Sequence, residues 1–406
     1  MGEIVEILKL GHAGDGVTSE GDFVPYTVPG DLVRISRMGK RAQVEEVLKS
    51  GAWRAEPRCR HFGRCGGCAL QHVSLQPYLA WKRDLVLSAL AQRGFNDVQV
   101  EPIRAVPPGT RRRAMFKARR SGNEVELGFY EPQSRNLVDI GECPVLVPAL
   151  ESLIAPLKRN LGALIGANET AELHATAMHS GVDLSIKLKR VRTPDVLMSL
   201  SQFASATKVA RLSWNGEAVA IAQTPIERVG RFTVELPPEA FLQPTAEGEN
   251  ILQSLLRDEA GNAAPIADLF SGWGAFTLAL ADARAVHAVD SAAPQIEALK
   301  RAARAGRADV TAETRDLYRR PLLAAELARF ETVVLDPPRP GAKAQVEALA
   351  QSGVARVLYV SCNPASFARD ARILVDGGFE LGRIVPLDQF LWSPHVELFA
   401  LFARSR

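Results

Sequence analysis

The pattern of hydrophobic and polar positions changes character along the 406-residue chain. Over the first fifty residues, short apolar runs such as "EIVEILKLG" and "LVRISRM" are separated by glycine and proline turns at "HAGDG" and "VPGD". Short strands with such turns predict a small β-barrel. The segment "LQPYLAWKRDLVLSALAQRG" has helical periodicity and should end at Gly94. From about Val98 to Phe241, strand and helix patterns mix without a strict repeat, which indicates a central α+β region.

The pattern becomes regular from Ala264 onward. The apolar runs "APIADLF", "AVHAVD", "FETVVLDPP" and "RVLYVSCN" alternate with helical stretches such as "APQIEALKRAARA" and "AKAQVEALAQSG". Strands that alternate with helices predict an α/β fold with a parallel, doubly wound sheet. We therefore expect three domains, which span residues 1–53, 54–240 and 241–406.

Composition places the chain among globular proteins, since 47% of its residues are hydrophobic and 23% are charged. No apolar run approaches the ~18 residues of a spanning helix, so no membrane association is expected. The start, "MGEIVEILKLGHAGDG", lacks the basic region and long apolar core of a signal peptide. The expected location is therefore the cytoplasm, where disulfides are rare. A monomer without an obligate protein partner is the default expectation.

The net charge of +3 hides a basic region. Residues 51–120 contain fourteen Lys and Arg against four Asp and Glu, while the rest of the chain is net negative. The stretch "RRRAMFKARR" from Arg111 to Arg120 interleaves arginine with apolar residues, as on a half-buried strand. A basic face gains affinity for phosphates by releasing counterions. We favour nucleic acid as the partner over the alternative, a solvated charged surface.

A glycine-rich turn follows the first strand of the regular region. "DLFSGWGAFTL" supplies Gly272 and Gly274 but no third glycine, which departs from the fingerprint of dinucleotide-binding folds. Asp290 ends the next strand, where an acid can accept hydrogen bonds from ribose hydroxyls. The combination suits an adenosyl ligand without a pyrophosphate, such as S-adenosylmethionine. A plain tight turn is the alternative.

Three further residues could carry chemistry. Asp336 in "LDPPRPG" ends a strand at the edge where ligands bind in such sheets. Cys362 in "VSCNPASFARD" precedes a helix that starts with proline, and the positive end of a helix can lower the pKa of a thiol. Glu397 interrupts the apolar run "HVELFALF", where loss of hydration would raise its pKa and suit proton transfer. The alternatives are an inert buried cysteine and a paired strand-edge acid.

Four of the five cysteines form a separate group. Cys59, Cys65 and Cys68 lie in "CRHFGRCGGC", and Cys143 precedes a proline in "ECP". Four cysteines that converge suit either zinc or an iron–sulfur cluster, and the spacing alone favours zinc slightly. A disulfide is a poor alternative for a cytoplasmic chain.

These motifs resemble the RNA 5-methyluridine methyltransferases, in particular the iron–sulfur branch that carries an N-terminal TRAM barrel. The resemblance implies a TRAM domain over 1–53, a central domain with the cysteine loop over 54–240 and a Rossmann-like class I methyltransferase domain over 241–406. It implies that Cys362 is the nucleophile and Glu397 the base. It further implies a [4Fe–4S] cluster on Cys59, Cys65, Cys68 and Cys143, and S-adenosylmethionine contacts from Gln243, Phe270, Asp290, Asp336 and, more loosely, Asp316.

The function that the resemblance implies is methylation of C5 of a uridine in RNA, with 23S ribosomal RNA as the preferred substrate. Thiolate addition to C6 would make C5 nucleophilic, and the target base must be flipped out or single-stranded. Transfer RNA is an alternative substrate. A non-catalytic RNA-binding protein with a decayed fold is a second alternative, against which the presence of both Cys362 and Glu397 argues. Ser271 and Ala275 depart from the family's usual glycine-turn motif, and Phe390 lacks the proline that often follows it.

Overall fold

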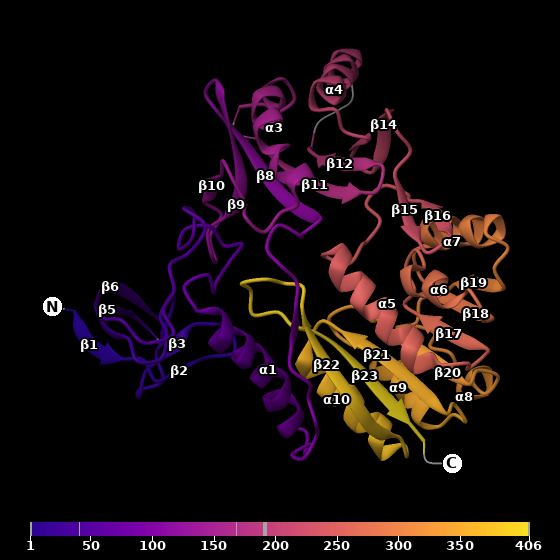
Figure 1. Ribbon diagram of the computed structural model, residues 1–406. Coiled ribbons are helices and arrows are strands. Elements are labelled where there is room, and N and C mark those ends of the chain that lie inside the picture. The colour runs from indigo at the N-terminus through magenta and orange to yellow at the C-terminus, as the bar shows by residue number, and fades with distance from the viewer. Residues whose placement is uncertain (1, 40, 168, 190–192, 405–406) are drawn as a thin grey trace.

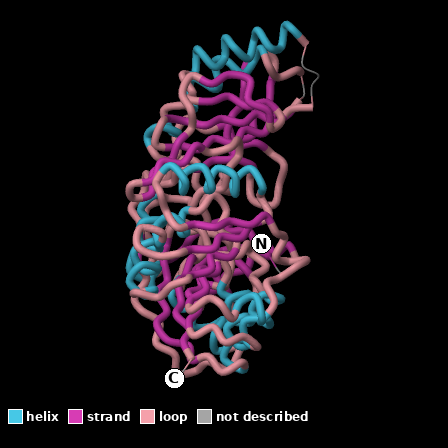
Figure 2. The backbone as a smooth tube through the Cα atoms, turned by 90° about the vertical axis from the view of Figure 1, so that its right-hand side faces the viewer, coloured by secondary structure: helices cyan, strands magenta, loops and turns pink. Residues whose placement is uncertain are grey.

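The computed structural model describes residues 2–39, 41–167, 169–189 and 193–404. Figure 1 shows three groups of strands, with the N-terminal group at one side, a central sheet above and the C-terminal α/β part below it. Helix α1 (Leu75–Ala91) runs between the N-terminal group and the C-terminal part. The turned view of Figure 2 shows an elongated molecule, with the C-terminus at the end opposite the central sheet.

The N-terminal strands form one sheet with the order β1-β5-β6-β4-β3-β2. Its inner side chains, which include Val24, Val33 and Ile35, are almost fully buried and form a small core of their own. The turn-rich pattern predicted a small β-barrel, and the structure has a β half-barrel in its place. Its strands are β1 (Glu3–Glu6), β2 (Lys9–Leu10), β3 (Gly16–Val17), β4 (Phe23–Val24), β5 (Leu32–Met38) and β6 (Arg41–Lys49).

The central sheet has the order β10-β9-β8-β11-β12-β13-β14 and packs against helices on one face. Strand β8 shows the alternation that a half-buried strand requires, since Ala114, Phe116 and Ala118 are buried while the residues between them face outward. The strands are β8 (Arg113–Ser121), β9 (Glu124–Tyr130), β10 (Leu137–Asp139), β11 (Thr170–Met178), β12 (Gly181–Lys187), β13 (Arg211–Trp214) and β14 (Glu217–Ile221). The helices are α2 (Pro148–Glu151), α3 (Ile154–Asn160), η1 (Leu161–Ala163) and α4 (Pro194–Thr207).

The C-terminal sheet has the order β19-β18-β17-β20-β21-β23-β22-β7. Strands β17 to β21 are parallel, as expected, but β23 runs antiparallel between β21 and β22. The reason is the short link between β22 and β23, which carries no crossover helix and so returns the chain antiparallel. The strands are β7 (Arg104–Ala105), β17 (Ile266–Leu269), β18 (Val286–Asp290), β19 (Val310–Thr314), β20 (Thr332–Leu335), β21 (Arg356–Ser361), β22 (Glu380–Asp388) and β23 (Glu397–Ala403).

Apolar cores cover both faces of this sheet, as in a class I methyltransferase fold. The helices of this region are α5 (Ala246–Ala260), α6 (Ala275–Leu280), α7 (Ala293–Ala305), α8 (Ala324–Leu327), α9 (Lys343–Ala350) and α10 (Pro364–Asp376). Among the residues that the structure describes, no helix is both long and apolar enough to cross a membrane.

Part of the middle of the chain also packs with the C-terminal sheet. Val86 and Leu90 of α1 lie in one of its cores, and β7 pairs with the end of β22. The hairpin of β15 (Ile226–Val229) and β16 (Phe232–Glu235) contributes to the other core. The central sheet and its helices have a core of their own, formed by residues between Ala114 and Trp214, while other residues between positions 53 and 240 join the cores of the C-terminal sheet. The division at residues 53 and 240 stays a prediction.

Candidate functional site

A cavity of about 690 Å³ opens at the carboxyl edge of the parallel strands. Such sheets bind their ligands at this edge, because loops from several strands meet there. The catalytic and cofactor residues expected from the sequence come from seven separate segments, and all of them line this cavity: Gln243, Phe270, Asp290, Asp316, Asp336, Cys362 and Glu397.

The glycine turn after β17 is fixed by Asp290 at the end of β18. The carboxylate of Asp290 accepts a hydrogen bond from the backbone N–H of Gly272 at 2.9 Å and from that of Ala292 at 2.8 Å. Gly274 has a φ of 89°, and a Cβ atom there would lie 2.4 Å from Leu299. Glycine is therefore required for the close approach of the turn to α7. This arrangement leaves the acid at the cavity wall, where a ribose can reach it.

An aromatic pair lies beside this acid. The rings of Phe270 and Tyr318 are 5.6 Å apart between centroids. The backbone N–H of Tyr318 donates to the carboxylate of Asp316 at 3.0 Å, which ties the second ring to the loop after β19. Tyr318 was not predicted from the sequence, although it stands only two residues after Asp316. Two rings beside this acid form an apolar surface in the cavity wall on which a flat ring can stack.

Cys362 lies in the turn between β21 and α10. Asn363 caps that helix by accepting a hydrogen bond from the N–H of Ala365 at 3.1 Å. The expected lowering of the thiol pKa by the helix start is wrong for the protein without ligands. Burial and the nearby carboxylates of Glu397 and Asp336 raise the pKa of Cys362 to about 12, against a smaller opposing effect of Arg339. One helix end is weaker than loss of hydration combined with two acids.

The two acids lie close to each other as well as to the thiol. Burial raises the pKa of Glu397 to about 8, while a hydrogen bond from Gln389 opposes the rise. Burial, followed by the charge of Glu397, holds the pKa of Asp336 well above its usual range. A carboxyl whose pKa lies near neutrality can exchange a proton during a reaction.

Two amide side chains connect these acids. Gln243 donates from Nε2 to Asp336 at 3.0 Å. Gln389 donates from its own Nε2 to the Oε1 atom of Gln243 at 2.9 Å and to Glu397 at 2.8 Å. The sequence analysis did not identify Gln389, because a single glutamine after a strand carries no pattern. A hydrogen bond of 3.3 Å between Arg339 and His395 at the cavity mouth was also missed.

The arginine-rich stretch has a different role from the one expected. Arg112 is buried and donates to the carbonyl of Gln243 at 2.9 Å and to Glu249 at 2.7 Å. Arg113 donates to the carbonyl of Leu242 at 2.6 Å. Both side chains therefore hold the segment that carries Gln243 instead of facing a phosphate.

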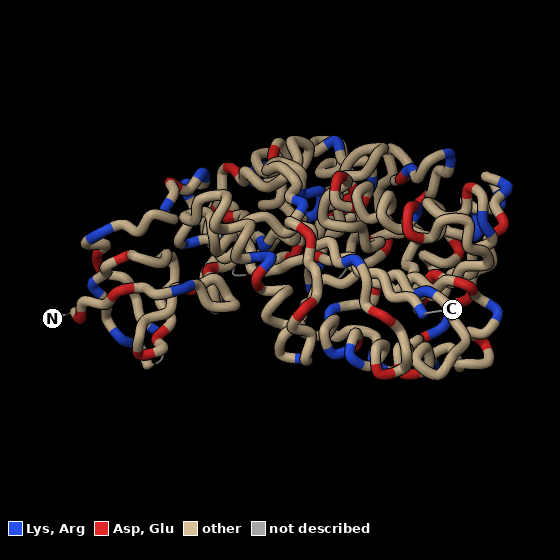
Figure 3. The backbone as a smooth tube through the Cα atoms, turned by 60° about the horizontal axis from the view of Figure 1, so that its bottom comes forward, with Lys and Arg blue, Asp and Glu red and all other residues tan. Residues whose placement is uncertain are grey.

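The other basic side chains of this stretch are also engaged within the protein. Lys117 forms an ion pair with Glu172, and Arg119 lies 2.6 Å from Glu126. Arg120 donates to a backbone carbonyl at 3.0 Å. Positive and negative residues are interspersed along the backbone in Figure 3. The local excess of basic residues counted in the sequence is thus partly offset by acids from other segments.

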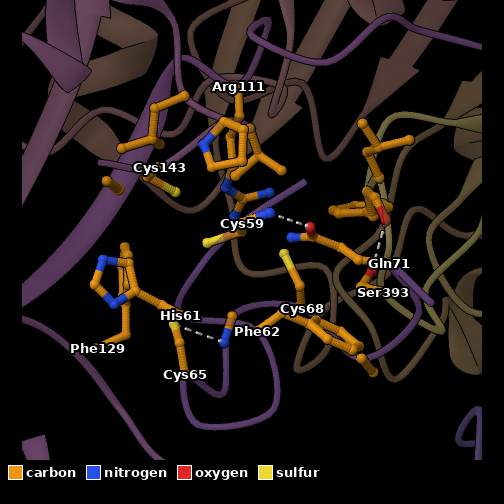
Figure 4. A pocket seen from close by; sticks show the side chains of 18 of the residues that line it. Cys59, His61, Phe62, Cys65, Cys68, Gln71, Arg111, Phe129, Cys143 and Ser393 are labelled. Carbon is orange, nitrogen blue, oxygen red and sulfur yellow. Dashed lines mark hydrogen bonds between the residues drawn. The ribbon is translucent and has the colours of Figure 1, made fainter. Parts of the chain in front are cut away.

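A second cavity, of about 520 Å³, is lined by Cys59, Cys65, Cys68 and Cys143. Figure 4 shows their sulfur atoms turned toward a common space, with Arg111 beside them. All four thiols are free, so the distant segments do converge without a disulfide. Burial raises the pKa of Cys68 to about 11 and that of Cys143 to about 12.

The geometry of these thiols limits what they could hold. Within the described part of the chain, no group of three or more His, Cys, Asp or Glu side chains is arranged to bind a metal ion. A zinc site needs its sulfurs about 2.3 Å from one ion, which draws them close together. The four thiols thus line one cavity but are not arranged as a metal site within the described residues.

Known proteins resemble this chain over its whole length. Residues 223–405 match the family model described as tRNA (Uracil-5-)-methyltransferase. An uncharacterized RNA methyltransferase of Brucella melitensis is 42% identical over 99% of this chain and 98% of its own. A 23S rRNA (uracil(1939)-C(5))-methyltransferase of Alteromonas naphthalenivorans is 35% identical over 100% of this chain and 90% of its own.

A solved structure agrees with the sequence comparisons. The tRNA (uracil-54, C5)-methyltransferase of Pyrococcus abyssi, in complex with S-adenosyl-L-homocysteine, matches with a TM-score of 0.77 at 25% identity, over 99% of this chain and 100% of its own. The fold, the cavity at the strand ends and the whole-length relatives lead to the same conclusion. The chain belongs to the RNA uracil-C5 methyltransferases, which transfer a methyl group from S-adenosylmethionine to C5 of a uridine in RNA.

Proposed function

We propose that this enzyme methylates a uridine of 23S ribosomal RNA through a covalent intermediate on Cys362, with Glu397 as the base. The observation that carries the mechanism is the meeting of one thiol and two carboxyls in a single cavity beside the glycine turn. A thiol next to a carboxyl of raised pKa is the arrangement that nucleophilic addition followed by proton removal requires.

The residues around the glycine turn suit the methyl donor. Asp290 would accept hydrogen bonds from the ribose, and Phe270 and Tyr318 would stack on the adenine. Asp316 and Asp336 border the same cavity and could contact the amino group or the ribose. When bound, S-adenosylmethionine supplies an electrophilic methyl group on a positively charged sulfur. That positive charge would favour the ionised forms of the thiol and the acids nearby.

The proposed reaction begins with addition of the Cys362 thiolate to C6 of the uracil. The bond to C6 moves electron density to C5, which then attacks the methyl group as its bond to the sulfonium sulfur breaks and S-adenosylhomocysteine is released. Glu397 takes the proton from C5 as a carboxylate. The C5–C6 double bond then re-forms, and the Cys362 thiolate leaves as the other product of elimination. Each step is easier than direct methylation of the electron-poor ring.

We propose that the four cysteines of the second cavity hold a [4Fe–4S] cluster, with zinc as the alternative. The donor set supports this, because four thiolates are the usual ligands of such a cluster. Methyl transfer requires no electron, so the chemistry that a cluster supplies here is structural. It would join the cysteine loop to the segment of Cys143, about eighty residues further along the chain.

The choice of substrate rests on the relatives. The enzyme from Alteromonas acts on 23S rRNA by its name and is 35% identical, whereas the enzyme from Pyrococcus acts on tRNA and is 25% identical. The N-terminal half-barrel would contact the RNA outside the catalytic cavity. We therefore prefer ribosomal RNA, with transfer RNA as the second candidate.

Two experiments test the proposal. Mapping of 5-methyluridine in the ribosomal and transfer RNA of a deletion strain should show one rRNA position that loses its methyl group. Loss from tRNA alone would contradict the rRNA assignment. RNA that contains 5-fluorouridine should form a denaturation-resistant adduct with the wild-type enzyme, because fluorine at C5 cannot be removed as a proton. No such adduct should form with Cys362→Ala.

A further inference from the structure

A buried amide lies next to the proposed base. Gln389 is 1% exposed, and its Nε2 atom donates one hydrogen bond to Glu397 at 2.8 Å and a second to Gln243 at 2.9 Å. Gln243 in turn donates a hydrogen bond from its Nε2 atom to Asp336 at 3.0 Å. Both N–H bonds of one amide are therefore used to hold acceptors beneath the catalytic cavity.

The backbone at Gln389 is anchored from a distant helix. Asp388 accepts hydrogen bonds from Tyr78, at 2.6 Å, and from Lys82, and both partners come from α1. Lys82 and Asp388 are completely buried. A buried charge pair with this many partners has little freedom to move. The residue that follows it is consequently held in one place relative to the start of β23, where Glu397 lies.

A glycine in α5 makes room for the amide. The Oε1 atom of Gln389 has no hydrogen-bond partner among the described residues. A Cβ atom on Gly248 would lie 2.4 Å from that oxygen and 3.1 Å from the Cβ atom of Gln389. The same Cβ atom would lie 2.8 Å from the Oγ1 atom of Thr245, which caps the helix. Since alanine would otherwise be the better helix former, the small size of Gly248 serves its contacts with Gln389, the nearer of the two, and with Thr245.

The orientation of the amide follows from its two acceptors. If the group were turned over, its oxygen would face the oxygens of Glu397 and Gln243. An ionised Glu397 would repel that oxygen, whereas it is stabilised by the N–H bond in the observed orientation. We propose that Gln389 is a positioning residue of the reaction, which holds Glu397 in its ionised form and aims it at C5, and that Gly248 is kept small for this purpose.

This proposal rests on the proposed role of Glu397 as the base. The titratable groups that face Glu397 are Asp336 after β20 and Cys362 after β21, and a negative charge on either disfavours ionisation of Glu397. Burial has the same effect, and the hydrogen bond from Gln389 opposes it. Loss of that bond should therefore raise the pKa of Glu397 further above its usual value.

The test is a single-turnover experiment with Gln389→Leu, which keeps the size of the side chain but removes its donors. Methylation of the RNA should continue, while release of the methylated product from Cys362 should slow by about tenfold or more at neutral pH. Methylated RNA bound covalently to the protein should then accumulate. Raising the pH should restore release more in this variant than in the wild type, because it ionises Glu397.

Three further variants make the result decisive. Gly248→Ala should slow release in the same way without changing any hydrogen-bonding group. Gln345→Leu removes an amide that is also 1% exposed and also forms two hydrogen bonds, but outside the cavity, and should release product normally. Its thermal unfolding serves as the reference for loss of stability. If Gln389→Leu and Gly248→Ala release product at the wild-type rate, or slowly at every pH, Gln389 does not position the base.

Glu397→Gln distinguishes failure of this inference from failure of the proposed function. If that variant stalls as a covalent adduct while Gln389→Leu does not, Glu397 remains the base and only the role of Gln389 is overturned. If Glu397→Gln itself releases product rapidly, another group removes the proton, and both proposals are wrong.

Discussion

The two cavities differ in what holds their functional side chains in place. Around Cys362, the acids and amides are connected by hydrogen bonds of their own, and the residues lie at the ends of strands. Around the four cysteines, the loop from Cys59 to Cys68 has turns but no helix or strand. The hydrogen bonds that hold this loop include one from the N–H of Cys59 to Oε1 of Gln71 at 3.0 Å and one from the N–H of Gly67 to the sulfur of Cys65 at 3.4 Å.

The catalytic side chains are therefore held by the ends of strands and by bonds to one another, whereas three of the four cysteines lie on a loop without a helix or strand. The two are nevertheless neighbours, because Arg111, Met115 and Phe390 line both. The loop from Phe390 to His395 joins them: the carbonyl of Trp392 accepts a hydrogen bond from the N–H of Ala69 at 2.8 Å, next to Cys68. Changes in one cavity can therefore be compared with changes in the other.

The largest expected effect is that of Cys362→Ala. Methyl transfer should fall on the order of a thousandfold or more, because no other thiol lines the catalytic cavity in the described structure. The folded structure and the metal content should be unchanged, since the residue does not line the cysteine cavity. Methyl incorporation, thermal unfolding and iron content measure these three properties. Turnover close to that of the wild type would contradict the covalent mechanism.

Much of this catalytic cavity could be predicted from sequence, for a physical reason. Asp290, Asp336 and Cys362 each end an apolar run, and the carboxyl ends of parallel strands meet at one edge. Periodicity therefore places such residues together even when they are far apart in the chain. The antiparallel direction of β23 was harder to predict, because the direction of a strand depends on the length of its connection and not on its apolar pattern.

The residues that the sequence analysis missed or misjudged depend on contacts between segments. Gln389 donates a hydrogen bond to Gln243, which lies 146 positions away, and no local pattern reports such a pair. Arg112 looked like a surface charge, because its acid partner Glu249 comes from α5. The pKa of Cys362 was misjudged for the same reason, since burial and, after it, two acids from other strands raise it.

An intermediate effect is expected from Cys143→Ser. The variant should lose its bound metal, and Tm should fall by roughly 5 °C or more, because the group no longer joins two distant segments. Wild-type protein purified without oxygen should be brown and contain about four irons per chain. Cys362→Ala is the matched control and should keep both iron and Tm. One zinc per chain without visible absorbance would decide for zinc instead of a cluster.

The smallest effect concerns two pairs of arginines. The first pair is Arg111 and Arg113, to be replaced in Arg111→Gln/Arg113→Gln. In the wild type, Arg111 donates to the carbonyl of Arg113 and Arg113 donates to that of Leu242, so these side chains are not free to neutralise phosphates. The slope of log affinity for RNA against log salt should stay close to that of the wild type. Some loss of stability should accompany the change, because buried carbonyls lose their donors.

Arg58 and Arg64 on the cysteine loop offer the opposite case, since both are exposed. Each phosphate contact contributes about 0.7 to 0.9 of a log unit to the salt slope. If these arginines contact the RNA, Arg58→Gln/Arg64→Gln should flatten the slope by that amount for each contact. The modified uridine should stay the same, because phosphate contacts carry no base information. Affinity measured across a salt series compares the two pairs directly. If the slope is flatter for the Arg111 and Arg113 variant but unchanged for the Arg58 and Arg64 variant, the RNA contacts the central strand and not the loop.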